Sequence, residues 1–307
     1  MIEELIYKKT KLNIDKNFYL KKLIIGNYKK IAEKNTTLKP NKNTTQFICN
    51  INKDLKILAL NKLGKVFHIN WEKSINNDLK LDHKILGNTS LNEILNFHNI
   101  EKNTPSYLCL LSNDGRFKKI LIDENMIESN RSYNAIKLKK DNEIIDSFIS
   151  NQNQILIILT SIGRLFKFSL NDKFIAPSSK QAQGIALIKL FPTEKIISCC
   201  NSTCDGGIAI ATKNGKIYKL ENKAIFDSSV AKLGYINEKI NIKKDAFIKI
   251  FDNKKIITIE TNKERSANIN LSEVDFLNNK YLYKTEFITF EKDEFISKIY
   301  TFDNWLD

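Results

Sequence analysis

The lysines and arginines of this sequence are the side chains whose spacing suggests chemistry. They recur just after short polar turns, as in "LNKLGKVFHI", "LSNDGRFKKI", "LTSIGRLFKF" and "ATKNGKIYKL". The glycines of these turns, at positions 64, 115, 163 and 215, lie 51, 48 and 52 residues apart. Cationic groups at a regular spacing can neutralise successive phosphates of a nucleic acid without reading its bases.

The basic residues after the turns form the predicted binding set. They are Lys21, Lys22, Lys65, Arg116, Lys118, Lys119, Arg164, Lys167, Lys216, Lys219 and Arg265. Lys180, ahead of Gly184, and Lys232, ahead of Gly234, would add a second layer of phosphate contacts. If the repeats are arranged radially, the set forms a belt around one rim. The alternative is that these are ordinary surface residues on exposed strands.

The histidines and cysteines show no arrangement for catalysis or metal binding. His68, His83 and His98 are scattered, with no Ser, Cys or Asp in register. The cysteines are Cys49, Cys109, Cys199, Cys200 and Cys204. Their odd number and apolar surroundings indicate reduced core thiols, and "CCNSTC" lacks the second ligand pair that tetrahedral zinc needs. There is also no glycine-rich nucleotide loop, so we expect no catalytic residue, metal or cofactor.

The charge balance indicates an anionic partner. The chain has 49 Lys and Arg against 35 Asp and Glu, a net charge of +14, which favours nucleic acid, an acidic protein or an anionic membrane surface. The abundance of Lys, Asn and Ile is also what A+T-rich coding sequence produces, which is an alternative cause of the excess. No apolar run approaches the roughly 18 residues of a membrane helix, and the N terminus lacks a signal-peptide core. The sequence predicts a cytoplasmic protein outside the membrane.

The turns belong to a longer repeat that must position these side chains. "ETNKERSANI" continues the series with Glu264 in the glycine slot, and "DKNFYLKKLI" precedes it with Phe18 there. A second motif, as in "QGIALIKLFPTEKIISC", follows each turn by about twenty residues. About four short apolar runs per unit predict an all-β, six-bladed β-propeller, with a β-solenoid as the alternative. Approximate blades span residues 1–44, 45–103, 104–152, 153–203, 204–252 and 253–307.

The repeat also predicts a turn type and the packing between blades. Asn214 and Gly215 are expected to form a tight primed turn in which both residues take a positive φ. The aromatic residues that recur in the strand after each turn are Phe67, Phe117, Phe166 and Tyr218. We expect them to pack between blades rather than to stack on bases.

Each unit thus combines an apolar strand, a turn, a basic strand and a later "IKL…EKII" motif. In "LTSIGRLFKFSL…QAQGIALIKLFPTEKIIS" and "IATKNGKIYKLEN", this unit resembles the repeat of the C-terminal domain of the DNA gyrase A subunit and its topoisomerase IV counterpart. The resemblance covers nearly the whole chain and implies a pinwheel-like propeller whose basic rim binds and bends double-stranded DNA. It also implies that catalysis lies in other parts of a type IIA topoisomerase, so the expected partners are its cleavage and ATPase subunits.

The segment at residues 28–40 departs from that resemblance. In gyrases the loop after the first hairpin carries a Gly- and Arg-rich box of roughly "QRRGGKG" that closes a DNA wrap. Here "YKKIAEKNTTLKP" keeps Lys29, Lys30, Lys34 and Lys39 without Gly or Arg, and the first two join the predicted DNA-binding set. Because the chain starts directly at the first blade, we expect a separately encoded domain, a fragment or a diverged paralogue. The alternative function is a protein-interaction module or a relic with little DNA binding.

Overall fold

The structure is a computed structural model in which most of residues 56–302 and several short strands before them are described. The described residues are 13–14, 22–25, 39–40, 47–50, 56–69, 93–100, 106–128, 131–151, 153–230, 235–236, 247–252, 256–271, 277–279, 282–286 and 290–302. Almost all of their regular structure is strand, as the repeat predicted.

The strands follow one another along the chain with two short helical turns between them. The strands are β1 (Asn13–Ile14), β2 (Lys22–Ile25), β3 (Lys39–Pro40), β4 (Phe47–Asn50), β5 (Lys56–Asn61), β6 (Lys65–Ile69), β7 (Ile94–Ile100), β8 (Tyr107–Ser112), β9 (Arg116–Leu121), β10 (Tyr133–Asn134), β11 (Ile144–Ser150), β12 (Ile155–Thr160), β13 (Arg164–Ser169), β14 (Ile185–Ala186), β15 (Ile196–Ser202), β16 (Gly207–Thr212), β17 (Lys216–Glu221), β18 (Tyr235–Ile236), β19 (Phe247–Asp252), β20 (Ile256–Thr261), β21 (Arg265–Asn270), β22 (Leu277–Asn279), β23 (Leu282–Glu286) and β24 (Ile296–Phe302). The helical turns are α3 (Glu124–Glu128) and η2 (Asn222–Ala224).

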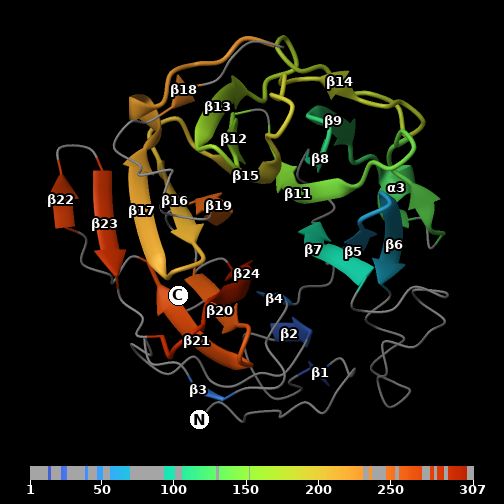
Figure 1. Ribbon diagram of the computed structural model, residues 1–307. Helices are drawn as coiled ribbons and strands as arrows, with labels where there is room; N and C mark the ends of the chain where they lie inside the picture. The colour runs from blue at the N-terminus through green and yellow to red at the C-terminus, as the bar shows by residue number, and fades with distance from the viewer. Residues whose placement is uncertain are drawn as a thin grey trace.

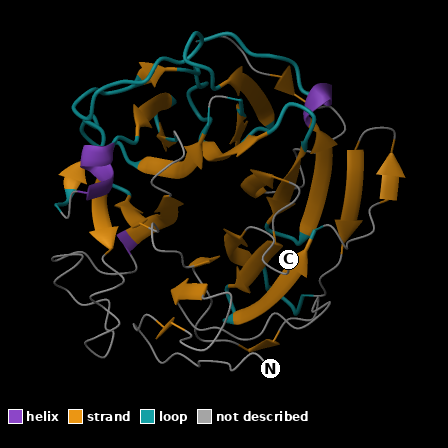
Figure 2. Ribbon diagram, turned by 180° about the vertical axis from the view of Figure 1, so that it is seen from behind, coloured by secondary structure: helices purple, strands orange, loops and turns teal. Residues whose placement is uncertain are grey.

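These strands form small antiparallel sheets arranged like blades around a common centre (Figure 1). Four blades have four strands, in the orders β7-β5-β6-β10, β11-β8-β9-β14, β15-β12-β13-β18 and β24-β20-β21-β3, and a fifth has five, β19-β16-β17-β23-β22. The first strand of each order lies toward the centre of the ring (Figures 1 and 2). The predicted all-β propeller is therefore confirmed. The described residues contain five full blades rather than six, together with a three-stranded sheet, β1-β2-β4.

Neighbouring blades exchange their outermost strands. After the hairpin β8-β9, the chain runs back to add β10 to the outer edge of the preceding blade, and only then enters β11 of its own blade. The same step places β14, β18 and β23 on the blades before their own. At the ends of the chain, β3 pairs with β21 of the last blade, Arg265 opposite Pro40 and Ser266 opposite Lys39. The exchange covers strand edges that would otherwise be open to pairing, and it joins the two ends of the chain.

The turn residues take the conformation that the repeat requires. Gly64, Gly115, Gly163 and Gly215 have φ of 76 to 80°, and Glu264 takes the same left-handed region at 54°. Each turn residue donates its backbone N–H to the carbonyl three residues earlier, at 2.9 to 3.1 Å. The predicted primed turn is wrong, because Gly215 has a positive φ and Asn214 does not. A single left-handed residue after a turn makes a hairpin with a bulge, so only one glycine is needed.

The core lies between the blades. The middle strands β8, β12 and β16 are buried along their whole length, since each packs against a blade on both faces. The predicted aromatic packing is confirmed for Phe67, Phe117, Phe166 and Tyr218, which are at most 2% exposed. Each inner strand also contains one bulge at the same repeat position, where its pairing with the middle strand shifts register.

Candidate nucleic-acid interface

The predicted DNA-binding residues differ in whether their charged groups already have partners inside the protein. Lys21, Lys29, Lys30 and Lys232 lie outside the described residues, and of Lys22 only the backbone, in β2, is described. The remaining ten belong to described strands and loops.

Lys119, Lys167 and Lys219 each connect one blade to the next. Each lies four residues after the turn residue of its hairpin, and its ammonium group donates to a carbonyl seven residues after the turn residue of the next hairpin. The acceptors are the carbonyl of Leu170, that of Asn222 at 3.2 Å and that of Leu271 at 2.6 Å. We call these three side chains the lysine latches. These lysines recur at the same position of each hairpin because each one bonds to the next blade.

Acidic side chains and burial reinforce the latches. The Lys119 ammonium lies 2.7 Å from a carboxylate oxygen of Asp172 and 4.3 Å from the centre of the Tyr107 ring. The hydrogen bond from Lys119 holds the pKa of Asp172 below its usual value. Lys167 lies 3.1 Å from Asp227, and burial lowers the pKa of Lys219. All three ammonium groups are therefore already engaged by acceptors within the protein.

Lys118 is buried and connects two separate loops. Its ammonium group donates to the carbonyls of Ala135 at 2.6 Å, Lys180 at 2.7 Å and Ala182 at 2.9 Å. Three acceptors use all three N–H donors of an ammonium group. Burial lowers the pKa of Lys118 to about 8. The residue therefore holds the outer loops of successive blades together.

Arg164 is also internal. Its side chain is 2% exposed and pairs with Glu194, whose side chain is fully buried, and it donates to the Lys189 carbonyl at 2.8 Å. Burial alone would raise the pKa of Glu194, but hydrogen bonds from Arg164, from the Thr160 hydroxyl and from the Phe191 backbone lower it below its usual value. Arg164 and Glu194 thus fix the turn of β12-β13 to the loop that leads into β15.

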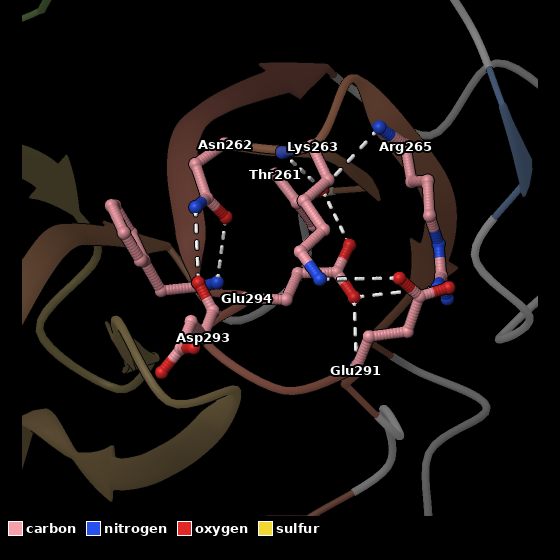
Figure 3. A network of polar contacts seen from close by, with 8 residues as sticks. Thr261, Asn262, Lys263, Arg265, Glu291, Asp293 and Glu294 are labelled. Carbon is pink, nitrogen blue, oxygen red and sulfur yellow. Dashed lines mark hydrogen bonds and ion pairs between the residues drawn. The ribbon is translucent and has the colours of Figure 1, made fainter.

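The last blade repeats this arrangement around Arg265 (Figure 3). The Thr261 hydroxyl donates to Glu294 at 2.7 Å, and the Arg265 guanidinium lies 3.4 Å from the same buried carboxylate. Arg265 also pairs with the exposed Glu291, which Lys263 approaches to 3.3 Å. The hydrogen bond from Lys263 and the positive charge of Arg265 together lower the pKa of Glu291 below its usual value. In contrast to Arg164, Arg265 keeps a 19% exposed side chain.

Seven of the predicted residues are partly exposed. Two of them are the latches Lys167 and Lys219, and the other five are Lys65, Arg116, Lys180, Lys216 and Arg265. Four of them are the first residue after a hairpin turn and begin β6, β9, β17 and β21, so the fold repeats them around the ring. Lys180 lies over the ring of Tyr133, 4.6 Å from its centre. These five side chains are the partly exposed members of the predicted belt that are not latches. Among them, Arg116 lies 3.4 Å from Asp114 and donates to the Gly184 carbonyl at 3.2 Å.

The histidines and cysteines found in the described ranges are mostly structural. His98 is buried, and burial lowers its pKa to about 4, while Ser147 Oγ lies 2.8 Å from its Nε2. Cys109 and Cys199 are buried, and burial raises the pKa of both thiols. Within the described residues, no three His, Cys, Asp or Glu side chains gather as metal ligands do, and no helix is long and apolar enough to cross a membrane. His83 lies outside the described residues.

Sequence reasoning missed the buried acids Glu194 and Glu294. Each lies two residues before the apolar run of an inner strand, in "TEKII" and "DEFIS". That shared position could have identified them. A buried carboxylate requires a cation or several hydrogen-bond donors, and the hairpin turn of the same blade supplies them.

A closed ring of small antiparallel sheets with exchanged outer strands defines a class, the strand-exchanging β-propellers. The C-terminal domain of DNA topoisomerase IV is similar to this chain in structure, with a TM-score of 0.66 and 17% identity over 89% of this chain and 85% of the other. The DNA gyrase A C-terminal domain has a TM-score of 0.64 and 16% identity over 85% and 87%. No family sequence model matches the chain, and no curated protein matches it in sequence. The chain therefore has the fold of these C-terminal domains, as its repeat motifs predicted.

Proposed function

We propose that this chain binds and bends double-stranded DNA and catalyses no reaction by itself. It would act as the DNA-binding part of a type IIA topoisomerase, with the cleavage and ATPase subunits as its partners. The observation that carries the proposal is a net charge of +14 on a fold shared with the C-terminal domains of DNA topoisomerase IV and DNA gyrase A.

The partly exposed basic residues give the proposal its physical basis. Lys65, Arg116, Lys216 and Arg265 occupy the same position in four of the five described hairpins, and Lys180 lies in an outer loop. In the hairpin between those of Arg116 and Lys216, this position is the buried Arg164. Such a ring can follow a phosphate backbone that curves around the protein, and it needs no base contacts. Binding should therefore depend weakly on base sequence and bend the duplex.

Charge reversal of two accessible residues tests the proposal. We expect Arg116→Glu with Lys216→Glu to weaken binding to a duplex of about one hundred base pairs by about ten- to hundredfold, because two cations are replaced by repelling charges. Fluorescence anisotropy measures the affinity, and ligase-catalysed circularisation of a short duplex measures bending. The matched variant, Arg116→Gln with Lys216→Gln, should lose about half as much affinity on a logarithmic scale.

The folded state of each variant is checked by far-ultraviolet circular dichroism and by its urea midpoint. Unchanged affinity in a folded double variant would contradict the proposed surface. A wild-type chain without measurable DNA affinity would favour the alternative function, a propeller that binds proteins.

A further inference from the structure

All described hairpin turns lie at one end of the ring, which we call the turn end. There the turns are joined by backbone hydrogen bonds to the loops that lead into the inner strands. These bonds run from Ile144 N–H to Lys62 O (2.8 Å), Asn113 N–H to Glu143 O (2.9 Å), Ser161 N–H to Lys195 O (2.8 Å), Asn262 N–H to Phe295 O (3.1 Å) and Ile296 N–H to Lys213 O (2.9 Å). We define the turn end as residues 61–65, 112–116, 137–143, 160–164, 189–195, 212–216, 261–265 and 291–295.

The opposite end, which we call the far end, is joined in the same way. Its backbone hydrogen bonds run from Ile122 N–H to Ser106 O, Leu170 N–H to Gln154 O and Asn222 N–H to Gly206 O, each 3.0 Å long. The far end comprises residues 122–128, 153–154, 170–175, 203–206 and 221–227. Strands of six residues at about 3.3 Å per residue separate the two ends by about 20 Å.

Charge is divided unequally between these two ends. Counted over the described residues alone, the turn end contains 14 Lys and Arg against 8 Asp and Glu, whereas the far end contains 2 Lys against 7 Asp and Glu. Two of these acids, Glu194 and Glu294, and one of these cations, Arg164, are buried. The described turn end therefore keeps 13 Lys and Arg that are not buried against 6 Asp and Glu. The ammonium groups of Lys119 and Lys167 reach the far end from β9 and β13, but Asp172 and Asp227 pair with them there.

The exposed lysines of the turn end come mostly from loops that the belt prediction did not include. They include Lys62, Lys137, Lys139, Lys140, Lys195 and Lys213. Among these, Lys139 and Lys140 lie in the loop between β10 and β11, next to the turn of β5-β6. The backbone hydrogen bond from Ile144 to Lys62 holds this loop beside the turn. The loop contributes three lysines and two acids, of which Glu143 pairs with Lys62 at 3.5 Å.

We propose that the DNA path lies against the turn end, across the loop 137–143 and the neighbouring turns, and that the far end faces away from the DNA. This rests on the proposed function and specifies its surface. At physiological salt, charges more than about 8 Å apart on the surface are largely screened from each other. The two ends therefore act on a phosphate backbone independently, one attracting it and the other repelling it.

Two double variants with equal changes in net charge test the placement. Lys139→Glu with Lys140→Glu alters the turn end, and Lys173→Glu with Lys223→Glu alters the far end, where both lysines are exposed. We expect the turn-end variant to bind a duplex of about one hundred base pairs at least tenfold more weakly and with a salt slope smaller by about 2. The far-end variant should stay within about threefold of the wild type.

Equal losses in both variants would overturn the placement while leaving DNA binding itself in place. Absence of salt-dependent binding by the wild-type chain would overturn both the placement and the proposed function.

A second test uses Cys204, an exposed thiol at the far end. A photoactivatable cross-linker on Cys204 should give little cross-linking to bound DNA. The same reagent on Lys139→Cys, in a Cys204→Ser background, should cross-link strongly, and Cys204→Ser alone measures labelling of other thiols. Stronger cross-linking from Cys204 than from the Lys139→Cys variant would overturn the placement.

Discussion

At the scale of single residues, the basic side chains have two separate tasks. The lysine latches, Lys118 and Arg164 hold blades and loops together, whereas the first basic residue after most turns stays accessible. The sequence predicted where the cations recur but not which way they point. Lys119 and Leu170 are 51 residues apart, and Arg164 and Glu194 are 30 apart. Partners so far apart in the chain leave no local sequence pattern. The repeat position alone therefore suggested one common task, DNA binding, for all of these cations.

Removal of one latch should destabilise the ring without affecting DNA binding. Lys219→Met leaves the carbonyl of the buried Leu271 without this donor, and we expect a loss of about 1–3 kcal/mol in the free energy of unfolding. Urea denaturation measures it. Lys173→Met, an exposed change, should stay within about 0.5 kcal/mol. Equal effects in the two variants would show that the latch contributes nothing.

The buried pair Arg164–Glu194 predicts an acid dependence of stability. The pKa of Glu194 is lowered in the folded state, so its contribution is fully present above the unfolded value of about 4.5 and is lost as the pH falls through the lower folded value. Urea midpoints of the wild type and of Glu194→Gln, measured between pH 7 and pH 3, should therefore converge at the acid end.

At neutral pH, Glu194→Gln should cost about 3 kcal/mol, because it leaves the buried Arg164 guanidinium without its counter-charge. Glu143→Gln is the matched control. Its ion pair with Lys62 is exposed on both sides at 3.5 Å, so its loss should cost at most about 1 kcal/mol. A parallel decline of wild type and Glu194→Gln with falling pH would refute the assignment.

At the scale of the elements, the hairpin turn was the most predictable feature. Its glycine spacing located four turns, and it extended correctly to Glu264, which has the positive φ of a glycine slot. The primed geometry was mistaken because an Asn-Gly pair also fits a turn with a single left-handed residue. The turn placed around Phe18 lies outside the described residues, although β1 and β2 on either side of it pair antiparallel.

The turn residues predict opposite effects for two substitutions. Glu264→Gly should stabilise the chain by about 0.5–1 kcal/mol, because glycine adopts a positive φ without the steric cost of a Cβ atom. Gly115→Ala should destabilise it by at least about 1 kcal/mol, since φ is +80° and the new Cβ would lie 2.8 Å from Ile188 Cγ1 and 2.9 Å from its carbonyl oxygen. Thermal unfolding compares both with the wild type, and a stabilising Gly115→Ala would contradict the turn assignment.

At the scale of the whole molecule, strand exchange links each described blade to its neighbour by backbone pairing. The outer strands β10, β14 and β18 are two residues long, and such short runs cannot be recognised as strands from sequence. Their pairing depends on the blades already standing side by side, so the sequence predicted units of four strands but not the exchange. The pairing of β3 with β21 links the N-terminal part of the chain to the last blade in the same way. The last two residues of the segment 28–40 therefore lie on the edge of that blade.

DNA binding by this ring through its exposed cations is the function that we propose. The most direct test is the slope of log affinity against log salt for a duplex of about one hundred base pairs. If each of the five partly exposed belt residues contacts one phosphate, the slope should be about −4.5 or steeper. That slope corresponds to about a 500-fold loss of affinity between 50 and 200 mM salt. A slope near zero over that range would contradict DNA binding through the exposed cations.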